Sequence, residues 1–194
     1  MTATDKYESL LELCKARHSC RAFSSSPVAR EDIDKVLNLA AASPYASGTK
    51  SWEIMVVSDL EKIKAMALAV RKRCAELGER SRDDFRKEFL DYSRFFTSFE
   101  TAPVLLIPAF RDRRSLSLEL PGQGLESFER ENSVKSISCV SMLVLLAAES
   151  LGLGACYMTG PLLAAEELGK LAGLRPGREP GALIPLGYKE QNNG

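Results

Sequence analysis

The chain contains 194 residues and carries 26 basic against 26 acidic side chains. This length predicts one globular domain over residues 1–194, with a sizeable apolar core. The neutral balance excludes the broad basic field with which proteins hold nucleic acid or anionic lipid, so we expect neither nucleic acid nor a membrane as a partner. The N-terminal segment MTATDKYESLLELCKARHS has no apolar stretch behind basic residues, which predicts a cytoplasmic protein without a secretory signal.

The five cysteines are scattered along the chain without a CxxC pair, and this pattern predicts reduced thiols rather than a disulfide framework. Cys14, His18 and Cys20 lie close enough in the sequence to raise the question of zinc. No fourth ligand accompanies them, and their spacing matches no usual zinc finger. We therefore expect no metal site.

The N-terminal part of the chain predicts two helices and a strand. Apolar residues recur at helical spacing from Tyr7 to Cys14, so a first helix runs up to the basic segment RHSCRAF at 17–23. A second amphipathic pattern covers residues 33–41. It ends near Pro44, because the residue before a proline resists the helical conformation. The segment EIMVVS at 53–58 has the composition of a strand.

The middle of the chain is first charged and then strongly apolar. Residues 61–99 predict helix in two pieces, split around Gly78. The segment APVLLIPAF at 102–110 is rich in branched aliphatic side chains, which is typical of a strand at the centre of a sheet and covered on both faces. Periodicity is lost from 111 to 133. This stretch predicts a long irregular connection, which is either a cover over an active site or an excursion without a role.

Residues 134–154 are apolar on nearly every side of a helical wheel. The helix that they predict is therefore buried all round, or shared with a second copy of the chain. A membrane span is excluded, because Lys135 and Glu149 leave fewer uncharged positions between them than the roughly 20 that a bilayer requires. Gly152 ends the helix in the left-handed conformation typical of a helix cap.

The end of the chain predicts a short strand, a helix and a final strand. ACYM at 155–158 is the short strand. Gly160 and Pro161 open the helix, with proline at its favoured first position, and Gly173 ends it. ALIPLGY at 182–188 is the final strand. The predicted class is α+β, with helices on both faces of a mixed sheet.

The segment RHSCRAF contains Arg17, Ser19 and Arg21 together with the only histidine of the chain, His18. One interpretation is that its cations complement the carbonyl end of the first helix. That interpretation accounts for one or two charges and leaves the S-x-R spacing unexplained. The other interpretation is a phosphate cradle, in which two forked guanidinium groups and a hydroxyl make charge-assisted hydrogen bonds. The residues alone leave both open.

Two parts of the sequence resemble the nitroreductase-like flavoprotein family. The stretch RHSCRAFSSSPVAREDIDKVLNLAAASPYASGTKSW is similar to the family's opening, which reads approximately R-R/H-S-x-R/K-x-F, then PV with a helix, then A-P-S-x-x-N-x-Q-P-W. In the second half, AAESLGLGACYMTGP and the closing PLGY resemble the family's A-x-x-L-G-L-G-x-x-W and L-G-Y. The likeness covers both ends of the chain and is weakest from about 60 to 130.

The resemblance implies a three-layer fold, with a mixed, mainly antiparallel sheet and helices on both faces. It also implies a homodimer with FMN bound in the interface. Carried across by position, the residues that would hold the FMN phosphate are Arg17, Ser19 and Arg21, with His18 beside them.

Two further groups of flavin-binding residues are implied by the resemblance in the same way. The group that would lie against the flavin of the other subunit consists of Pro44, Tyr45, Ala46 and Gly48. The group that would direct backbone N–H groups toward the N5 and O4 edge of the ring consists of Met158, Thr159 and Gly160.

The activity that the resemblance implies is that of an NAD(P)H-dependent FMN oxidoreductase. Hydride passes from NAD(P)H to N5 of the flavin, and then to a small electron-poor acceptor such as a nitroaromatic or a quinone, in ping-pong order. No side chain is expected to act as a catalytic nucleophile. His18 lies between two arginines that disfavour its protonation, and no GxSxG turn accompanies it, so a hydrolase is set aside.

The flavin-facing residues also depart from the family's pattern. Where the family has serine, asparagine, glutamine and proline, this chain has Tyr45, Gly48, Lys50 and Ser51, while Trp52 matches. Relatives usually add a basic residue to the phosphate beyond the last strand, and here only Lys189 in GYKEQNNG could replace it. These departures keep an alternative open, namely a flavin-binding storage or sensor protein without turnover.

Overall fold

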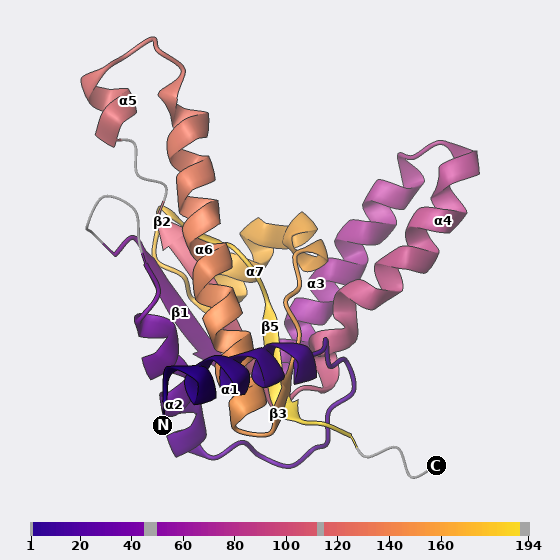
Figure 1. Cartoon of the computed structure of the whole chain (residues 1–194). Helices are drawn as coiled ribbons and strands as arrows, with labels where there is room; N and C mark the ends of the chain where they lie inside the picture. Colours follow the sequence, from indigo (N-terminus) through magenta and orange to yellow (C-terminus); the bar gives the residue numbers. More distant parts are fainter. Residues whose placement is uncertain (1, 45–49, 112–114, 191–194) are drawn as a thin grey trace.

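The computed structural model describes residues 2–44, 50–111 and 115–190, and Figure 1 shows their arrangement. Five strands form one sheet: β1 (Trp52–Val57), β2 (Val104–Arg111), β3 (Leu153–Ala155), β4 (Arg178–Pro180) and β5 (Ile184–Tyr188). The strand order is β1-β2-β5-β3, with β4 also paired to β2. All four pairings between these strands are antiparallel. The predicted α+β class with a mainly antiparallel sheet is therefore confirmed.

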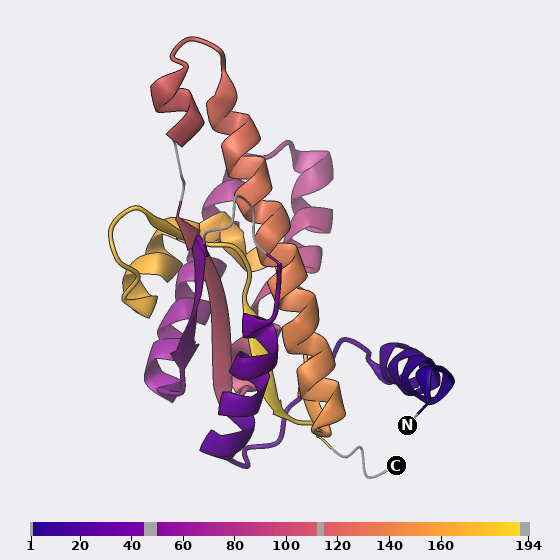
Figure 2. The ribbon, with the colours of Figure 1, turned by 60° about the vertical axis from the view of Figure 1, so that its left-hand side comes forward.

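Helices cover both faces of this sheet (Figures 1 and 2). The helical elements are α1 (Ala3–Ala16), α2 (Arg30–Ala41), α3 (Leu60–Glu79), α4 (Asp83–Ser93), the 3-10 helix η2 (Arg94–Thr101), α5 (Ser115–Glu119), α6 (Leu125–Ser150), the 3-10 helix η3 (Gly160–Ala164) and α7 (Ala165–Ala172). One core cluster joins α2 and α6 to one face of the sheet. A second joins α3, η2 and α7 to the other face.

Strand β2 lies between the two core clusters, and its side chains alternate between them. Leu106 belongs to the cluster with α2 and α6, while Leu105 and Ile107 belong to the cluster with α3. Every residue from Val104 to Phe110 is buried. The prediction of a central strand covered on both faces is confirmed, because such a strand has no polar face to present to water.

Helix α6 begins at Leu125, and α5 precedes it, so the expectation of an irregular connection from 111 to 133 was wrong. The physical reason is visible in Figure 1, where α5 and the first turns of α6 extend beyond the sheet. Helix that is not packed on the core needs no apolar stripe, and its sequence therefore shows no helical period. We call residues 115–133 the α5–α6 arm. Within it, the Glu129 carboxylate accepts hydrogen bonds from the Ser117 N–H and hydroxyl at 3.1 and 2.9 Å.

The remainder of α6 is the core helix. Among the described residues, α6 taken whole (Leu125–Ser150) is the only helix that is long and apolar enough, by length and composition, to cross a membrane, and half of its most apolar window is buried inside the fold. It packs along α2 and on the sheet. Gly152 follows it with φ +71°, which confirms the predicted left-handed helix end.

Helix α1 has the predicted position but does not bury its apolar stripe. A capping box of Thr2 and Asp5 begins the helix, which ends at Ala16. Within the single chain described, none of its side chains is buried, and Tyr7 and Leu10 are 62% and 53% exposed. Figure 2 shows α1 standing apart from the body of the molecule.

Residues 61–99 form two α-helices as predicted, but the break falls at 80–82, after Gly78. Gly78 is needed for packing, because a Cβ built there would lie 2.9 Å from a methyl carbon of Leu90 on α4. We call residues 60–93 the α3–α4 arm. The 3-10 helix η2 follows α4 directly and returns the chain to the body, where Arg71 of α3 holds Glu100 through two hydrogen bonds of 2.7 and 2.9 Å.

The last third of the chain contains the predicted elements with shifted boundaries, and also the strand β4, which the sequence did not predict. The short strand is Leu153–Ala155 rather than 155–158, and Met158 forms an isolated bridge with Leu183 instead. The helix predicted from Gly160 begins as η3 and continues as α7. It ends at Gly173, which has φ +72°.

Candidate functional site

The segment that contains the two arginines is fixed to the edge of the sheet. Arg17 is the C-cap of α1, and its N–H donates to the Leu13 carbonyl at 3.1 Å. Ser19 then forms a parallel bridge with Ala155 of β3, and the Cys20 N–H donates to the Ala155 carbonyl at 3.0 Å. The backbone of this segment is therefore held by β3, although most of its side chains face outward.

The side chains of this segment divide into buried and exposed groups. Cys20 is 7% exposed and faces the interior, and burial raises the pKa of its thiol, so it stays protonated and unreactive. His18, Ser19 and Arg21 are exposed, and Arg17 is half-buried. Within the described part of the chain, neither Arg17 nor Arg21 forms an ion pair. Both guanidinium groups therefore remain available to an anion.

The two interpretations of RHSCRAF apply to different residues. His18 Nδ1 lies 3.0 Å from the carbonyl oxygen of Ala16, the last residue of α1, so the imidazole serves the carbonyl end of the helix. The tautomer with a proton on Nδ1 makes this contact a hydrogen bond. The helix-end interpretation thus accounts for His18. It leaves the guanidinium groups of Arg17 and Arg21 without a described partner, which favours the phosphate cradle for them.

The turn from Met158 to Gly160 supplies two unpaired backbone donors. Met158 exchanges two hydrogen bonds with Leu183, at 3.0 Å through its N–H and 2.9 Å through its carbonyl. Its N–H is therefore not available to a ligand. Among the described residues, the N–H groups of Thr159 and Gly160 donate no backbone hydrogen bond, and Pro161 follows inside the first turn of η3. Such unpaired N–H groups at a helix start are suited to donate hydrogen bonds to the electron-rich edge of a ligand.

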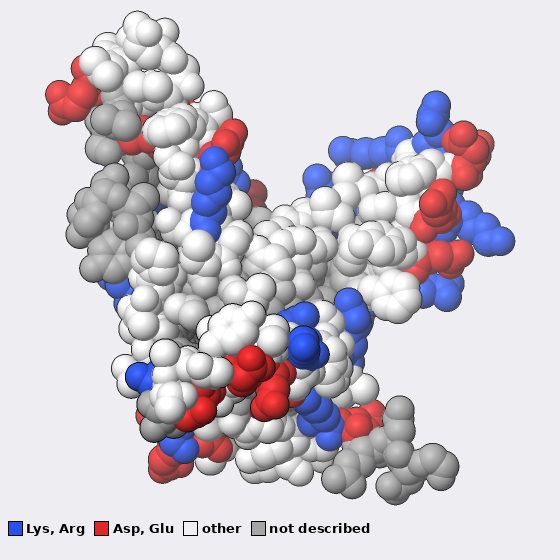
Figure 3. Space-filling view, viewed as in Figure 1, with Lys and Arg blue, Asp and Glu red and all other residues white. Residues whose placement is uncertain are grey.

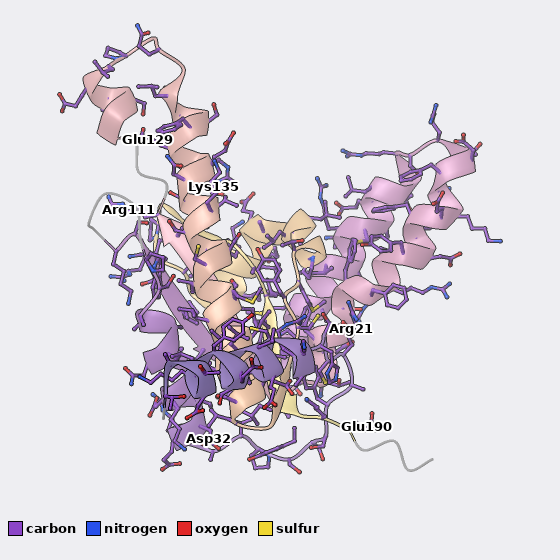
Figure 4. The ribbon with its side chains drawn as sticks, in the orientation of Figure 1. Arg21, Asp32, Arg111, Glu129, Lys135 and Glu190 are labelled. Atoms are coloured by element: carbon purple, nitrogen blue, oxygen red, sulfur yellow. The ribbon has the colours of Figure 1, made fainter. Side chains whose placement is uncertain are left out.

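A pocket of about 390 Å³ brings Arg21 together with this turn. Its lining consists of Arg21, Tyr92, Phe95, Phe96 and the continuous stretch 156–161. Figure 4 places Arg21 beyond the end of α1, beneath the α3–α4 arm. The pocket thus joins a cation from the N-terminal segment to backbone amides that lie more than a hundred residues later in the chain.

Aromatic side chains from η2 and the end of α4 form one side of this pocket. Tyr92 and Phe95 are 63% and 59% exposed, and the Tyr92 ring meets the Phe96 ring edge-on with centroids 5.2 Å apart. Tyr157 adds a further ring that is 37% exposed. None of these aromatic residues was predicted from the sequence as part of the site. The feature of the sequence that could have indicated them is the aromatic stretch YSRFF, which lies within an otherwise charged segment.

Not every predicted site residue is brought to this pocket. Arg17 and Ser19 lie on the neighbouring segment and do not line it. Pro44 is exposed beyond the end of α2, and Tyr45, Ala46 and Gly48 lie outside the described residues. Lys189 Nζ lies 3.0 Å from both carboxylate oxygens of Glu149, so its charge is already paired.

Two further observations concern other places in the molecule that could hold a ligand or a metal ion. A larger groove of about 660 Å³ lies between α3 and α7, but none of the predicted site residues lines it. Its rim charges pair with one another, as in the Lys170–Glu166 contact of 2.8 Å. Among the described residues, no group of three or more His, Cys, Asp or Glu side chains could hold a metal ion. We therefore assign the site to the smaller pocket.

The pocket, together with the neighbouring segment that carries Arg17 and Ser19, has groups that fit a ligand with a planar ring and an anionic tail. Two forked guanidinium groups and the Ser19 hydroxyl suit a phosphate. The aromatic side chains suit a ring system, and the N–H groups of Thr159 and Gly160 suit its polar edge. The fold is that of a three-layer α+β protein, and its pocket combines a cation, aromatic rings and unpaired backbone N–H groups among the described residues.

Comparison with known proteins identifies the family. Residues 14–188 match the model of the nitroreductase family, and the chain belongs to that family. Iodotyrosine deiodinase 1 of Rattus norvegicus is 31% identical in an alignment of 191 positions that covers 91% of this chain and 61% of that protein. The chain therefore spans less than two thirds of the length of this relative.

Solved structures share the fold at lower sequence identity. A BluB-like flavoprotein of Clostridium difficile 630 superposes with a TM-score of 0.83 at 24% identity, over 95% of this chain and 92% of that one. The NADPH:FMN oxidoreductase of Vibrio harveyi, solved with NAD⁺, gives a TM-score of 0.70 at 21% identity, over 94% of this chain and 70% of that one. These two likenesses establish the fold, and the predicted nitroreductase-like fold is confirmed.

Proposed function

We propose that this chain is an FMN-dependent oxidoreductase that passes hydride from NAD(P)H to a small electron-poor acceptor such as a nitroaromatic or a quinone. The observation that carries the proposal is that Arg21 and the unpaired amides of Thr159 and Gly160 share one pocket. Membership of the nitroreductase family supports it, as does the fold shared with a protein named an NADPH:FMN oxidoreductase. We place the protein in the cytoplasm.

The proposal gives each part of the site a role. Arg17, Ser19 and Arg21 bind the phosphate of FMN, and Arg21 also reaches the pocket in which the ring lies. Thr159 and Gly160 direct their N–H groups at the N5 and O4 edge of the ring and hold it in one orientation. When bound, FMN supplies the reversible acceptance of hydride, and the protein supplies orientation and electrostatics. No side chain of the pocket is required as a nucleophile.

We further propose that two copies of the chain form the site. The apolar stripe of α1 is uncovered in the single chain, and α6 exposes Val134 and Met142 by 40% and 50%. Figure 3 shows a largely uncharged surface between the two arms. An uncovered apolar surface of this kind is typical of an interface, and a second copy covers it while bringing its residues 44–48 to the flavin.

A second reaction has support from one specific observation. The rat relative is named an iodotyrosine deiodinase, and the pocket here has an aromatic side suited to a halogenated phenol ring. In reductive dehalogenation, two electrons and one proton replace the carbon–halogen bond by a carbon–hydrogen bond and release halide. The electrons come from NAD(P)H in both candidates. They differ only in the acceptor.

The experiment begins with the absorption spectrum of the purified protein. We expect flavin bands that bleach anaerobically with NADPH or NADH and recover when an acceptor is added. Recovery with a nitroaromatic or a quinone supports the first reaction, and release of iodide from an iodophenol supports the second. Flavin bands that ignore both nicotinamides indicate the storage or sensor protein. A colourless protein that also fails to take up added FMN refutes the proposal.

A further inference from the structure

We propose that Phe96 is a positioning residue, which fixes the backbone of Thr159 and Gly160 so that their N–H groups point into the pocket. The inference rests on the proposed function in assigning these N–H groups to the flavin ring. It concerns a residue that neither binds the phosphate nor reacts. Its evidence is a contact between two segments that lie more than sixty residues apart in the chain.

The Phe96 ring lies directly against the backbone of Gly160. A Cβ built on Gly160 would lie 2.4 Å from Cδ1 of Phe96, 2.5 Å from Cε1 and 2.8 Å from Cγ. Gly160 is not one of the described glycines with positive φ, so its backbone conformation is open to any residue. The ring, and not the backbone, therefore requires glycine at this position. The space between the Phe96 ring and the Gly160 backbone is too small for any side chain, so the ring lies against the two peptide groups that flank Gly160.

Phe96 is itself held from several sides. Tyr92 packs edge-on against its ring, at 5.2 Å between centroids. Phe99 lies three residues later on the same face of η2, where it is fully buried. At the end of η2, the two hydrogen bonds between Arg71 and Glu100 join the segment to α3. The ring therefore presents a fixed surface to Gly160.

The turn that Phe96 touches has few other restraints. Met158 is bonded to Leu183 on one side, and on the other the Leu162 N–H donates to the Thr159 carbonyl at 3.0 Å. Between these bonds, the N–H groups of Thr159 and Gly160 have no backbone partner among the described residues. Without the ring, the intervening peptide groups are free to rotate and turn their N–H groups away from the pocket.

The first test uses the protein without flavin. We expect Phe96→Ala to lower the NMR order parameter of the Gly160 N–H from the rigid value of about 0.85 toward or below about 0.6. Phe96→Tyr keeps the ring and should keep the order. Phe89→Ala is the matched control, because Phe89 is also a partly buried ring against the same core cluster, and it does not line the pocket. An unchanged Gly160 order parameter in Phe96→Ala overturns the inference.

The second test is a double-mutant cycle read by flavin affinity. Gly160→Ala places a methyl group inside the Phe96 ring and should weaken FMN binding by about tenfold or more, whereas in the Phe96→Ala background the same change should cost less than about twofold. Riboflavin should show the same ratios as FMN, because the effect lies at the ring and not at the phosphate. If Gly160→Ala weakens FMN binding by the same factor in the presence and in the absence of the Phe96 ring, the inference is overturned.

The outcomes separate this inference from the proposed function. If the unaltered protein takes up neither FMN nor riboflavin, the proposed function fails, and the order parameter still decides whether Phe96 fixes the turn. If it takes up flavin and both variants behave as independent changes, the proposed function stands and the role of Phe96 is refuted.

Discussion

Lys189, immediately after the last strand, holds Glu149 near the end of α6 through two contacts of 3.0 Å. The lysine side chain is 33% exposed and the glutamate 13% exposed, so the carboxylate is largely removed from water. Lys189 is the residue that the sequence offered as a substitute for a further phosphate ligand. Its ammonium group already neutralises a buried charge, so the proposed phosphate site rests on Arg17, Ser19 and Arg21.

We expect Lys189→Met to lower the free energy of unfolding by about 1–3 kcal/mol, because it leaves the Glu149 carboxylate buried without its partner. The double variant with Glu149→Gln should recover part of this loss, since no net charge then remains buried. Urea unfolding of the flavin-free protein measures both. FMN affinity of the double variant should match that of the unaltered protein, and a large loss would show that Lys189 contacts the phosphate after all.

Replacing Arg17 and Arg21 together by alanine should release FMN while the fold persists. Two charge-assisted contacts contribute about 1.5–3 kcal/mol each, so the affinity should fall by about a hundredfold or more. Quenching of flavin fluorescence gives the dissociation constant, and circular dichroism reports the fold.

The matched control replaces Arg80 and Arg82, which are exposed in the turn between α3 and α4 and lie outside the pocket. It removes the same two charges from the molecule. Riboflavin, which has no phosphate, should bind Arg17→Ala nearly as well as the unaltered protein. Retention of FMN at full affinity in the double arginine variant would contradict the phosphate cradle.

The Arg71–Glu100 pair predicts a pH dependence of stability. The hydrogen bond from Arg71 lowers the pKa of Glu100, so the folded state binds fewer protons than the unfolded state near the ordinary pKa of a glutamate. The stabilisation is therefore present above that ordinary pKa, about 4.3, and is lost as the pH falls through the lowered value. Because both side chains are partly exposed, we expect the contribution to be at most about 1 kcal/mol.

The measurement compares urea unfolding of the unaltered protein with that of Arg71→Gln. The difference should be present at neutral pH and should shrink as the pH falls below the ordinary glutamate pKa of about 4.3 and through the lowered pKa of Glu100. A difference that stays constant over this range would mean that the arginine stabilises the fold by packing rather than by charge.

Met142→Glu should break the proposed homodimer. Met142 is 50% exposed on α6, and a carboxylate cannot be buried against a second copy without a partner. Sedimentation should show a dimer for the unaltered protein and a monomer for the variant. FMN should be lost with the dimer, because in the proposed site residues 44–48 of the second copy complete the binding of the flavin.

The control for this prediction is Leu68→Glu, which introduces the same charge at a residue of α3 that is 63% exposed. Alkylation of Cys139 gives an independent measurement of the dimer, since this residue precedes Met142 by almost one turn and its thiol is exposed in the single chain. It should resist alkylation in the dimer and react in the Met142→Glu monomer. A flavin-bound monomer of the unaltered protein would contradict the shared site.

The sequence predicts those parts of the fold whose side chains meet the core, and it misses those that extend away from it. The strand from Val104 to Phe110 was recognisable because burial on both faces makes every position apolar. The first turns of α6, from Leu125 to about Ser133, were not recognisable because they project in the α5–α6 arm, where no apolar period is needed. The stripe of α1 was recognised, yet a single chain leaves it uncovered.

The site shows the same division. Arg21 and the Thr159–Gly160 turn were named from motifs, and the structure brings them to one pocket. The Met158 N–H is unavailable to a ligand because it donates to the Leu183 carbonyl, and Phe96 contacts Gly160. Both contacts join segments that are distant in the sequence. No local pattern in the sequence specifies such pairings, so they required the three-dimensional structure.

The bridge between Ser19 and Ala155 has a consequence for selectivity. It ties the arginine segment to the strand that leads directly into the Thr159–Gly160 turn, so the separation between these two parts of the molecule is set by a few backbone bonds. In the proposed site, a nucleotide whose charged group is attached by a longer or shorter chain would contact one part or the other, but not both at once. We therefore expect the length of a ligand, as well as its chemistry, to decide whether it binds.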